Sequence, residues 1–372
     1  MSEELKKGAA FIFEATDPQD VFTFEDFDEE DLMFAKTAKD FSYNEVIPLA
    51  DEIEEHDRKI PINVELMKKA GELGLLMVEI PEEYGGLGKG LSSAMLVAES
   101  ASQNGSFTTT MMCHTGIGSL PLVYFGTREQ KEKYLPLLAT GEYIGAYALT
   151  EEGFGSDALS AKTRAVRSEC GKYWILNGTK QWITNAGFAD VFTVYAKVDG
   201  EHFSCFLVRR DDPGVSTGAE EHKMGIRGSS TRQLILEDCK IPIDRLVGEI
   251  GKGHKVALNI LNIGRLKLGL GSLGAMKEMV RYANSYAAER KQFGKTINNF
   301  QLIKEKLVNM ILDIFITESM AYRTSGMMDK AIAKISLPHD SEEYFTQKVN
   351  TIEEYAIEAS ILKVFGSEAL AR

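Results

Sequence analysis

Two short segments combine hydroxyl and aromatic residues in a pattern that suits the binding of a flat ligand. Residues 147–157 read YALTEEGFGSD, and residues 181–185 read QWITN. Thr150 and Thr184 each offer a hydroxyl and a backbone N–H where a predicted strand ends, and Trp182 offers a large flat surface. The side chains in these two segments could therefore stack on a ring and donate hydrogen bonds to its edge.

The glycine-rich turn of the first segment completes this pattern. Gly155 precedes Ser156 and would let the backbone approach a ligand closely, because glycine has no Cβ atom. A heteroaromatic ring with several carbonyl and nitrogen acceptors, such as an isoalloxazine, would use such a set. Either segment alone also suits an ordinary strand and turn, because threonine and tryptophan are common strand residues. The two segments together favour the ligand-binding interpretation.

Three zones of different hydrophobic period follow one another along the chain. From about residue 25 to 142 the apolar residues follow a helical period, and helices are predicted over 30–51, 62–74, 92–104 and 127–139. From about residue 143 to 250 the period changes to two, and strands are predicted over 191–197, 203–209 and 232–237. From residue 251 onward long helices return, with one apolar face formed by Ile303, Leu307, Met310 and Ile314.

The connections in the middle zone are short, with turn signals such as Asn177-Gly178 and Asp199-Gly200, so antiparallel pairing is predicted. The fold class is therefore α+β, with a helical N-terminal domain, a central antiparallel β-domain and a C-terminal helical bundle. The predicted boundaries are 1–24 for an N-terminal extension, then 25–142, 143–250 and 251–372 for the three domains.

A glycine motif of the kind that binds dinucleotides occurs once, at residues 269–274 (GLGSLG). It lies inside a helical zone with no strand before it, so it fails the structural context that this motif requires. Its small residues are interpreted as a place where two helices approach closely.

The composition is that of a soluble globular protein. The chain has 372 residues, 44% of them hydrophobic, and a formal net charge of −13, which argues against a nucleic-acid partner. The four cysteines form no CxxC pair, so neither a metal site nor a disulfide framework is predicted: Cys113, Cys170, Cys205 and Cys239. The sequence shows no signal-peptide pattern and no transmembrane segment. The protein is therefore expected in the cytoplasm or an organelle matrix, and is not expected to be secreted.

Several longer motifs occur in an order and spacing that resemble the acyl-CoA dehydrogenase family. The most specific are TEEGFGSD at 150–157, KQWITNAG at 180–187 and ERKQFGKTINNFQ at 289–301. LGLLMVEIPEEYGGLG at 73–88 and GTREQKEKYLPLLATGE at 126–142 support them. The resemblance extends from the first helices to the last residue. It is closest to the long-chain and very-long-chain branch, on GAAFIFEATDPQDVFTFEDF at 8–27 and EYAIEASILKVFGSEA at 354–369.

This resemblance implies an enzyme of fatty acid β-oxidation. Its expected reaction is the FAD-dependent α,β-dehydrogenation of fatty acyl-CoA thioesters to trans-2-enoyl-CoA, with electrons passed to an electron-transfer flavoprotein. The family resemblance also implies a homodimer or a dimer of dimers, with FAD bound between the β-domain and the C-terminal helices.

The resemblance implies roles for particular residues by their motif positions. The flavin and its pyrophosphate would be lined by Tyr147, Leu149, Thr150, Gly155 and Ser156, and the ring edge covered by Trp182, Ile183 and Thr184. The FAD of a neighbouring subunit would be reached by Arg290, Gln292, Phe293 and Gln301. The guanidinium of Arg290 suits a pyrophosphate, because it can bind such an anion through two hydrogen bonds. The CoA portion of the substrate would be contacted by Ser156, Asn262 and Arg265.

No catalytic carboxylate is expected in the given chain. The reaction needs a glutamate base to remove a proton beside the thioester. Most members of the family carry this base in a Glu-Gly-Thr motif that would lie beyond Arg372, and a minority carry it on the helix that here contains Gly264. The chain is therefore expected to be truncated before its base. The glutamates near its end are interpreted as solvated or packing residues: Glu353, Glu354, Glu358 and Glu368.

Two alternatives to a dehydrogenase stay open. An acyl-CoA oxidase would share the flavin motifs, and a non-catalytic FAD-binding scaffold or assembly protein would keep the fold without the base. The floor of the acyl pocket is placed at residues 107–116 (FTTTMMCHTG). The sequence does not indicate which acyl-chain length the pocket prefers. The polar segment 335–350 is interpreted as a surface excursion between helices, with no assigned role.

Overall fold

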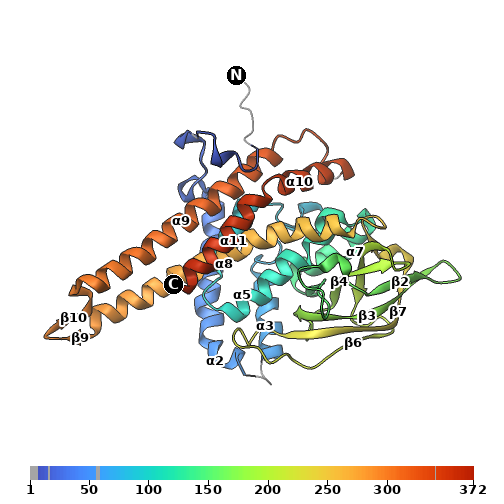
Figure 1. Ribbon diagram of the computed structural model, residues 1–372, viewed down its shortest axis with the longest axis horizontal. Coiled ribbons are helices and arrows are strands. Elements are labelled where there is room, and N and C mark those ends of the chain that lie inside the picture. Colours follow the sequence, from blue (N-terminus) through green and yellow to red (C-terminus); the bar gives the residue numbers. More distant parts are fainter. Residues whose placement is uncertain (1–6, 16, 56–58, 340) are drawn as a thin grey trace. The chain divides into compact units, whose positions relative to one another are not determined.

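The structure is a computed structural model that describes residues 7–15, 17–55, 59–339 and 341–372 (Figure 1). Its contacts group the described residues into two units. The helical unit comprises those in 1–44, 90–105 and 264–372, and the sheet unit those in 45–89 and 106–263. This grouping differs from the consecutive domains predicted from the sequence, because the helices before residue 142 are shared between the two units. Residues 1–6 and Thr16 of the predicted N-terminal extension lie outside the described residues.

The α-helices are α1 (Glu29–Phe41), α2 (Ala50–Ile53), α3 (Lys59–Glu72), α4 (Leu91–Ser100), α5 (Gly105–Met112), α6 (Leu120–Phe125), α7 (Arg128–Thr140), α8 (Gly253–Glu289), α9 (Gln301–Ile332), α10 (Glu342–Glu354) and α11 (Ala356–Ala371). The single helix predicted over 30–51 is wrong. A π-helical turn (Ser42–Val46) and a 3₁₀ turn (Ile47–Leu49) separate α1 from α2. Pro48 in the 3₁₀ turn has no N–H to donate, which explains the break. No helix among the described residues is long and apolar enough to cross a membrane.

The strands are β1 (Gly145–Ala148), β2 (Arg164–Arg167), β3 (Tyr173–Thr184), β4 (Val191–Val198), β5 (His202–Arg209), β6 (Val215–Thr217), β7 (Thr231–Pro242), β8 (Leu246–Val247), β9 (Lys291–Gln292) and β10 (Lys295–Thr296). One sheet has the order β6-β7-β3-β2-β4-β5-β8, with β1 also paired to β4, and β9 and β10 form a separate hairpin. β4 and β5 form the core of the sheet unit, since both strands are buried along almost their whole lengths.

The predicted antiparallel pairing of the β-domain is wrong in two places. β1 and β2 both pair with β4 in parallel, whereas the β2–β3, β3–β7, β4–β5, β5–β8 and β6–β7 pairs are antiparallel. The sheet is therefore mixed. The parallel pairs arise because β1 and β2 reach β4 through longer connections, which run through residues 149–163 and through β3.

One of the two predicted turns is also wrong. Asp199 and Gly200 have positive φ and connect β4 to β5, as the sequence predicts. Asn177 and Gly178 instead lie inside β3, where the pairing with β7 shifts in register. Only glycine fits there, because an added Cβ at Gly178 would lie 2.4 Å from the hydroxyl of Thr163. The Asn-Gly pair thus marks a bulge in a strand.

In the helical unit, α9 packs against α4, α10 and α11. The glycine motif at 269–274 lies in α8 and allows close packing, as its helical context predicts. An added Cβ at Gly269 would lie 2.5 Å from the side chain of Leu362 in α11, and one at Gly274 would lie 2.3 Å from the carbonyl oxygen of Glu99 in α4.

The segment 335–350 is more than the predicted surface excursion. It contains most of α10, which Ser341 caps by accepting a hydrogen bond from the N–H of Tyr344. Four side chains of this helix are buried: Tyr344, Phe345, Val349 and Ile352. These apolar residues follow a helical period, but the polar residues around Pro338 mask it in the sequence. The segment was therefore mistaken for a surface excursion. Asp340 lies outside the described residues.

The described N-terminal residues up to Phe27 lie against α9 and α11 of the helical unit. The ring of Phe27 lies edge-on to that of Tyr322 in α9, with centroids 5.0 Å apart. The N–H of Ala9 donates to Glu358 of α11 at 2.6 Å, and Lys330 of α9 donates to the carbonyl of Asp20 at 2.9 Å. The first described residues therefore hold the last helices of the chain.

Candidate functional site

The two segments singled out in the sequence lie side by side in the sheet unit. The backbone N–H of Gln181 in β3 donates to the carbonyl of Thr150, just after β1, at 2.8 Å. The ammonium of Lys180 also reaches the carbonyl of Leu149, at 3.1 Å. The end of β1 and the last third of β3 thus lie together in the sheet unit.

A β-bulge turns Trp182 outward. The pairing of β3 with β7 is regular from Gly178 to Lys180 and resumes at Ile183, so Gln181 and Trp182 lie in a second irregular step. Trp182 has a φ of 60°, which is unfavourable for a bulky residue, and its side chain is 56% exposed. Bulges and strained backbone conformations cluster at functional sites. The indole is therefore held in a solvent-facing position at a cost in backbone energy.

The turn after Thr150 leaves open space. Gly153 has a φ of 80°, and neither Gly153 nor Gly155 has any atom within 4 Å of an added Cβ. Ser156 is exposed and Thr150 is half-buried. Among the described residues, no hydrogen-bond partner is found for the N–H of Thr150. An unpaired donor beside an open glycine turn fits a ligand with acceptor atoms.

A buried ion pair that no sequence motif predicted joins these elements. Glu151 accepts a hydrogen bond from Lys180 at 2.7 Å, and both side chains are buried. Glu151 also accepts from the N–H of Lys162 at 2.6 Å and from the hydroxyl of Thr163 at 2.5 Å. Burial opposes ionisation of Glu151, but Lys180 and these hydrogen bonds outweigh it and lower its pKa. Lys180 is the one charged residue of the second motif, KQWITNAG, but the first motif contains three acidic residues and gives no sign of which of them pairs with it.

Several predicted site residues point into the protein. The ring of Tyr147 packs on Tyr195 with centroids 5.1 Å apart, and its hydroxyl donates to the carbonyl of Ala257 in α8 at 3.3 Å. Leu149 and Ile183 are buried. These three residues can therefore offer backbone groups and packing, rather than polar side-chain atoms, to a ligand.

The end of β3 is fixed by a buried thiol and a buried amide. Burial raises the pKa of Cys113 to about 12, so its thiol stays protonated and can donate to the carbonyl of Thr184, 3.9 Å away. Asn185, with a φ of 67°, donates to the carbonyl of Thr110 at 3.0 Å. Asparagine tolerates this left-handed conformation better than most residues. These contacts hold the half-buried Thr184 in position.

The segment proposed as the acyl-pocket floor, 107–116, runs through α5 into a π-helical segment, Cys113–Gly118. His114 there is fully buried. Its Nδ1 accepts from the N–H of Gly145, and its Nε2 therefore donates to the carbonyl of Leu138, each at 2.9 Å. The imidazole thus links this segment to β1 and α7 as a neutral side chain.

The predicted residues of the helical unit gather around the β9–β10 hairpin between α8 and α9 (Figure 1). Arg290, Gln292 and Gln301 are exposed. Phe293 is 91% exposed and has a φ of 51°, in a hairpin turn where asparagine or aspartate is usual. A bulky apolar side chain held in solvent by an unfavourable backbone conformation suits contact with another molecule.

The two further predicted substrate residues lie on α8, three positions apart. Asn262 is buried and Arg265 is half-buried. Gly264 lies between them, so this part of α8 presents no carboxylate. Of the four terminal glutamates, Glu358 is buried, and the other three are exposed.

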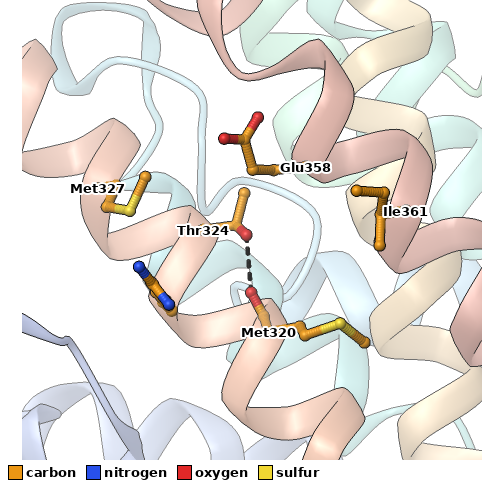
Figure 2. A pocket seen from close by; sticks show the side chains of 6 residues that line it. Met320, Thr324, Met327, Glu358 and Ile361 are labelled. Atoms are coloured by element: carbon orange, nitrogen blue, oxygen red, sulfur yellow. Dashed lines mark hydrogen bonds between the residues drawn. The ribbon is translucent and has the colours of Figure 1, made fainter. Parts of the chain in front are cut away.

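One pocket of the helical unit does not involve the predicted site. It has a volume of about 110 Å³ and lies between α9 and α11 (Figure 2). Met320, Thr324 and Met327 line it from α9, and Glu358 and Ile361 from α11. No group of three or more His, Cys, Asp or Glu side chains suited to a metal ion occurs in the part of the chain that the structure describes.

Comparisons with known proteins decide the family. Models for the N-terminal, middle and C-terminal domains of acyl-CoA dehydrogenases match residues 28–142, 146–239 and 251–372. The chain belongs to the acyl-CoA dehydrogenase family. The chain is 51% identical to a "Probable acyl-CoA dehydrogenase" of Bacillus subtilis (strain 168). The match covers 99% of this chain and 61% of that protein. The chain is 40% identical over 80% of its length to the human mitochondrial very long-chain specific acyl-CoA dehydrogenase, and covers 44% of it.

The solved structures agree on the fold. A crystal structure of an acyl-CoA dehydrogenase complexed with FAD, from Bacillus anthracis, superimposes with a TM-score of 0.95 at 53% identity. The match covers 98% of this family member and 62% of that chain. This family member thus spans less than two thirds of the length of these relatives. The predictions of the family and of its fold class are confirmed, with the mixed sheet as the correction.

Proposed function

We propose that this chain binds FAD and catalyses the α,β-dehydrogenation of fatty acyl-CoA thioesters to trans-2-enoyl-CoA in fatty acid β-oxidation. The observation that carries the proposal is the bulge that exposes Trp182 beside Thr150. It combines an outward indole, an unpaired backbone donor and an open glycine turn in one local site. The FAD in the complex of the Bacillus anthracis acyl-CoA dehydrogenase supports the choice of flavin.

The residues proposed to hold FAD fit an isoalloxazine by their chemistry. In the sheet unit they are Tyr147, Leu149, Thr150, Gly155, Ser156, Trp182, Ile183 and Thr184. Thr150 donates through its N–H, Trp182 covers one face or edge of the ring, and the glycine turn leaves room for the chain of the cofactor. FAD would supply the hydride acceptor that amino-acid side chains lack.

We place the remaining contacts with FAD at a subunit boundary. Arg290, Gln292, Phe293 and Gln301 would reach the FAD of a neighbouring copy in a homodimer or a dimer of dimers. The exposed apolar side chains of α9 support such an assembly, because monomers rarely expose many together: Leu302, Val308, Ile311, Leu312 and Phe315.

We assign the CoA portion of the substrate to Ser156, Asn262 and Arg265, and the electrons to an electron-transfer flavoprotein. Gly264 and the positions of the four terminal glutamates support the proposal that residues 1–372 supply no catalytic base. The bacterial relatives support a cytoplasmic location.

The first test asks which flavin the chain binds. The protein is refolded with FAD or with FMN, and the bound flavin is extracted and identified. We expect FAD. A chain that binds only FMN, or neither cofactor, would contradict the proposal.

The second test separates binding from chemistry. Palmitoyl-CoA is added under anaerobic conditions, with CoA alone as the control. We expect palmitoyl-CoA to perturb the flavin spectrum without bleaching it, because the thioester docks and no base removes its proton. Rapid bleaching would place the base within residues 1–372. No spectral change would favour the scaffold alternative, and fast reoxidation by oxygen after chemical reduction would favour the oxidase.

A further inference from the structure

The buried pair Glu151–Lys180 is more heavily bonded than a simple structural ion pair requires. The side chains are 7% and 0% exposed, and the ammonium and carboxylate are 2.7 Å apart. A buried ion pair contributes little net stability over well-packed apolar residues, because removing two charges from water is costly. The position of this pair therefore calls for a reason other than stability.

The carboxylate end of the pair fixes a loop. Glu151 accepts from the N–H of Lys162 at 2.6 Å, from the N–H of Thr163 at 3.0 Å and from the hydroxyl of Thr163 at 2.5 Å. These bonds tie the residue after Thr150 to the segment that leads into β2. Glu151 cannot move without breaking several charge-assisted hydrogen bonds.

The ammonium end of the pair is directed at one peptide group. Lys180 donates to the carbonyl oxygen of Leu149 at 3.1 Å, and the N–H at the other end of that same peptide belongs to Thr150. A cation on the carbonyl oxygen draws electron density along the peptide and makes its N–H a stronger donor. This N–H has no partner among the described residues, and the next carbonyl, that of Thr150, is held by the N–H of Gln181 at 2.8 Å.

We propose that Lys180, held in place by Glu151, orients and polarises the Leu149–Thr150 peptide so that its N–H donates strongly to an acceptor atom of a bound flavin ring. Glu151 and Lys180 are thus positioning residues, and the inference rests on the FAD binding proposed above. A strong donor to the ring favours the reduced, more electron-rich flavin, so the pair raises the midpoint potential of the flavin as well as its affinity.

The test uses the double variant Glu151→Gln/Lys180→Met. It removes both charges together, so no unpaired charge is left in the interior. We expect the dissociation constant of FAD to rise by about 10- to 100-fold, which is the effect of losing one hydrogen bond strengthened by a charge. The midpoint potential should become more negative, and the visible spectrum of the bound flavin should shift. Lys180→Arg keeps the charge and should restore most of the potential.

The matched control is a second buried ion pair of the same sheet unit. Arg245 and Asp212 lie 2.5 Å apart, and each side chain is 9% exposed. Arg245→Met/Asp212→Asn should change the stability of the fold but leave the flavin potential and spectrum as in the wild type. This comparison separates a role in the flavin site from a general loss of stability.

The outcomes are distinguishable. A folded Glu151→Gln/Lys180→Met variant with wild-type FAD affinity, spectrum and potential would overturn the inference and leave the proposed function standing. Failure of the wild-type protein to bind any flavin would overturn both. If the double variant does not fold, Lys180→Gln takes its place. A wild-type midpoint potential of the flavin in that variant would overturn the inference.

Discussion

Replacement of Glu220 by glutamine should destabilise the sheet unit in a way that depends strongly on pH. The carboxylate of Glu220 is buried between Lys59, 2.9 Å away, and Arg232, 2.7 Å away. It also accepts from the hydroxyl of Ser230 at 2.6 Å and from the N–H of Thr231 at 3.2 Å. Burial alone would raise the pKa of Glu220, but these partners outweigh it and lower the pKa from 4.5 to about 2.

The size of the effect follows from this pKa. The difference between 4.5 and about 2 corresponds to about 3 kcal/mol, at about 1.4 kcal/mol for each pKa unit. Because the pKa is lower in the folded state, this stabilisation is complete above the unfolded value of 4.5 and is lost as the pH falls through about 2. Glu220→Gln should therefore cost about 3 kcal/mol or more at pH 7, since Lys59 also loses its buried partner, and clearly less at pH 3.

The assay is urea unfolding followed by circular dichroism at pH 7, pH 4 and pH 3. Glu201→Gln is the control, because Glu201 is exposed at the turn between β4 and β5. The control should unfold like the wild type at each pH. The reasoning would be refuted if Glu220→Gln were no less stable than the control at pH 7, or if its loss of stability were the same at pH 7 and pH 3.

Three further predictions concern single residues. Trp182→Gly should remove the cost of about 1–2 kcal/mol that a left-handed conformation imposes on a non-glycine residue. Thermal unfolding of this variant should therefore show equal or higher stability, and titration should show weaker FAD binding. Trp182→Ala should lose FAD affinity without the gain in stability. Arg290→Ala should weaken FAD binding by about 1.5–3 kcal/mol, and sedimentation should show that FAD is lost when the dimer dissociates; a stable monomer with full FAD occupancy would contradict this. His114→Ala should cost about 1–3 kcal/mol for each of its two unpaired partners, the N–H of Gly145 and the carbonyl of Leu138, as measured by urea unfolding, and a variant as stable as the wild type would show that water replaces the imidazole.

The parts of the fold that the sequence predicted are those with a regular hydrophobic period. α3, α4 and α7 and strands β4 and β5 have such a period, and each was predicted close to its observed bounds, whereas β7 was predicted at only half its length. Turn residues were less reliable, because Asn177-Gly178 serves equally well in a bulge. Parallel pairing of β1 and β2 with β4 depends on how distant segments meet, which no local pattern encodes.

The candidate site was predicted in outline only. Thr150 and Trp182 could be grouped because their motifs share a chemistry, and the structure brings them together. Nothing in the sequence indicated that Lys180 donates to the carbonyl of Leu149, because this contact joins two residues that are thirty-one positions apart and meet only in the folded protein. The positive φ of Trp182 and of Phe293 was also invisible, since sequence patterns predict such angles only for glycine and asparagine.

The hydrogen bonds between the N-terminal segment and the last helices have a consequence for the order of events during synthesis. All residues of the sheet unit have been made once residue 263 has been added, so its sheet can form while the ribosome is still translating α9. The aromatic ring of Phe27 and the N–H of Ala9, although made first, must wait for Tyr322 and Glu358. Closing a loop of more than three hundred residues is slow compared with forming local contacts. The nascent chain should therefore carry the segment around Ala9 and Phe27 uncovered, and exposed to chaperones and proteases, until α9 and α11 emerge from the ribosome.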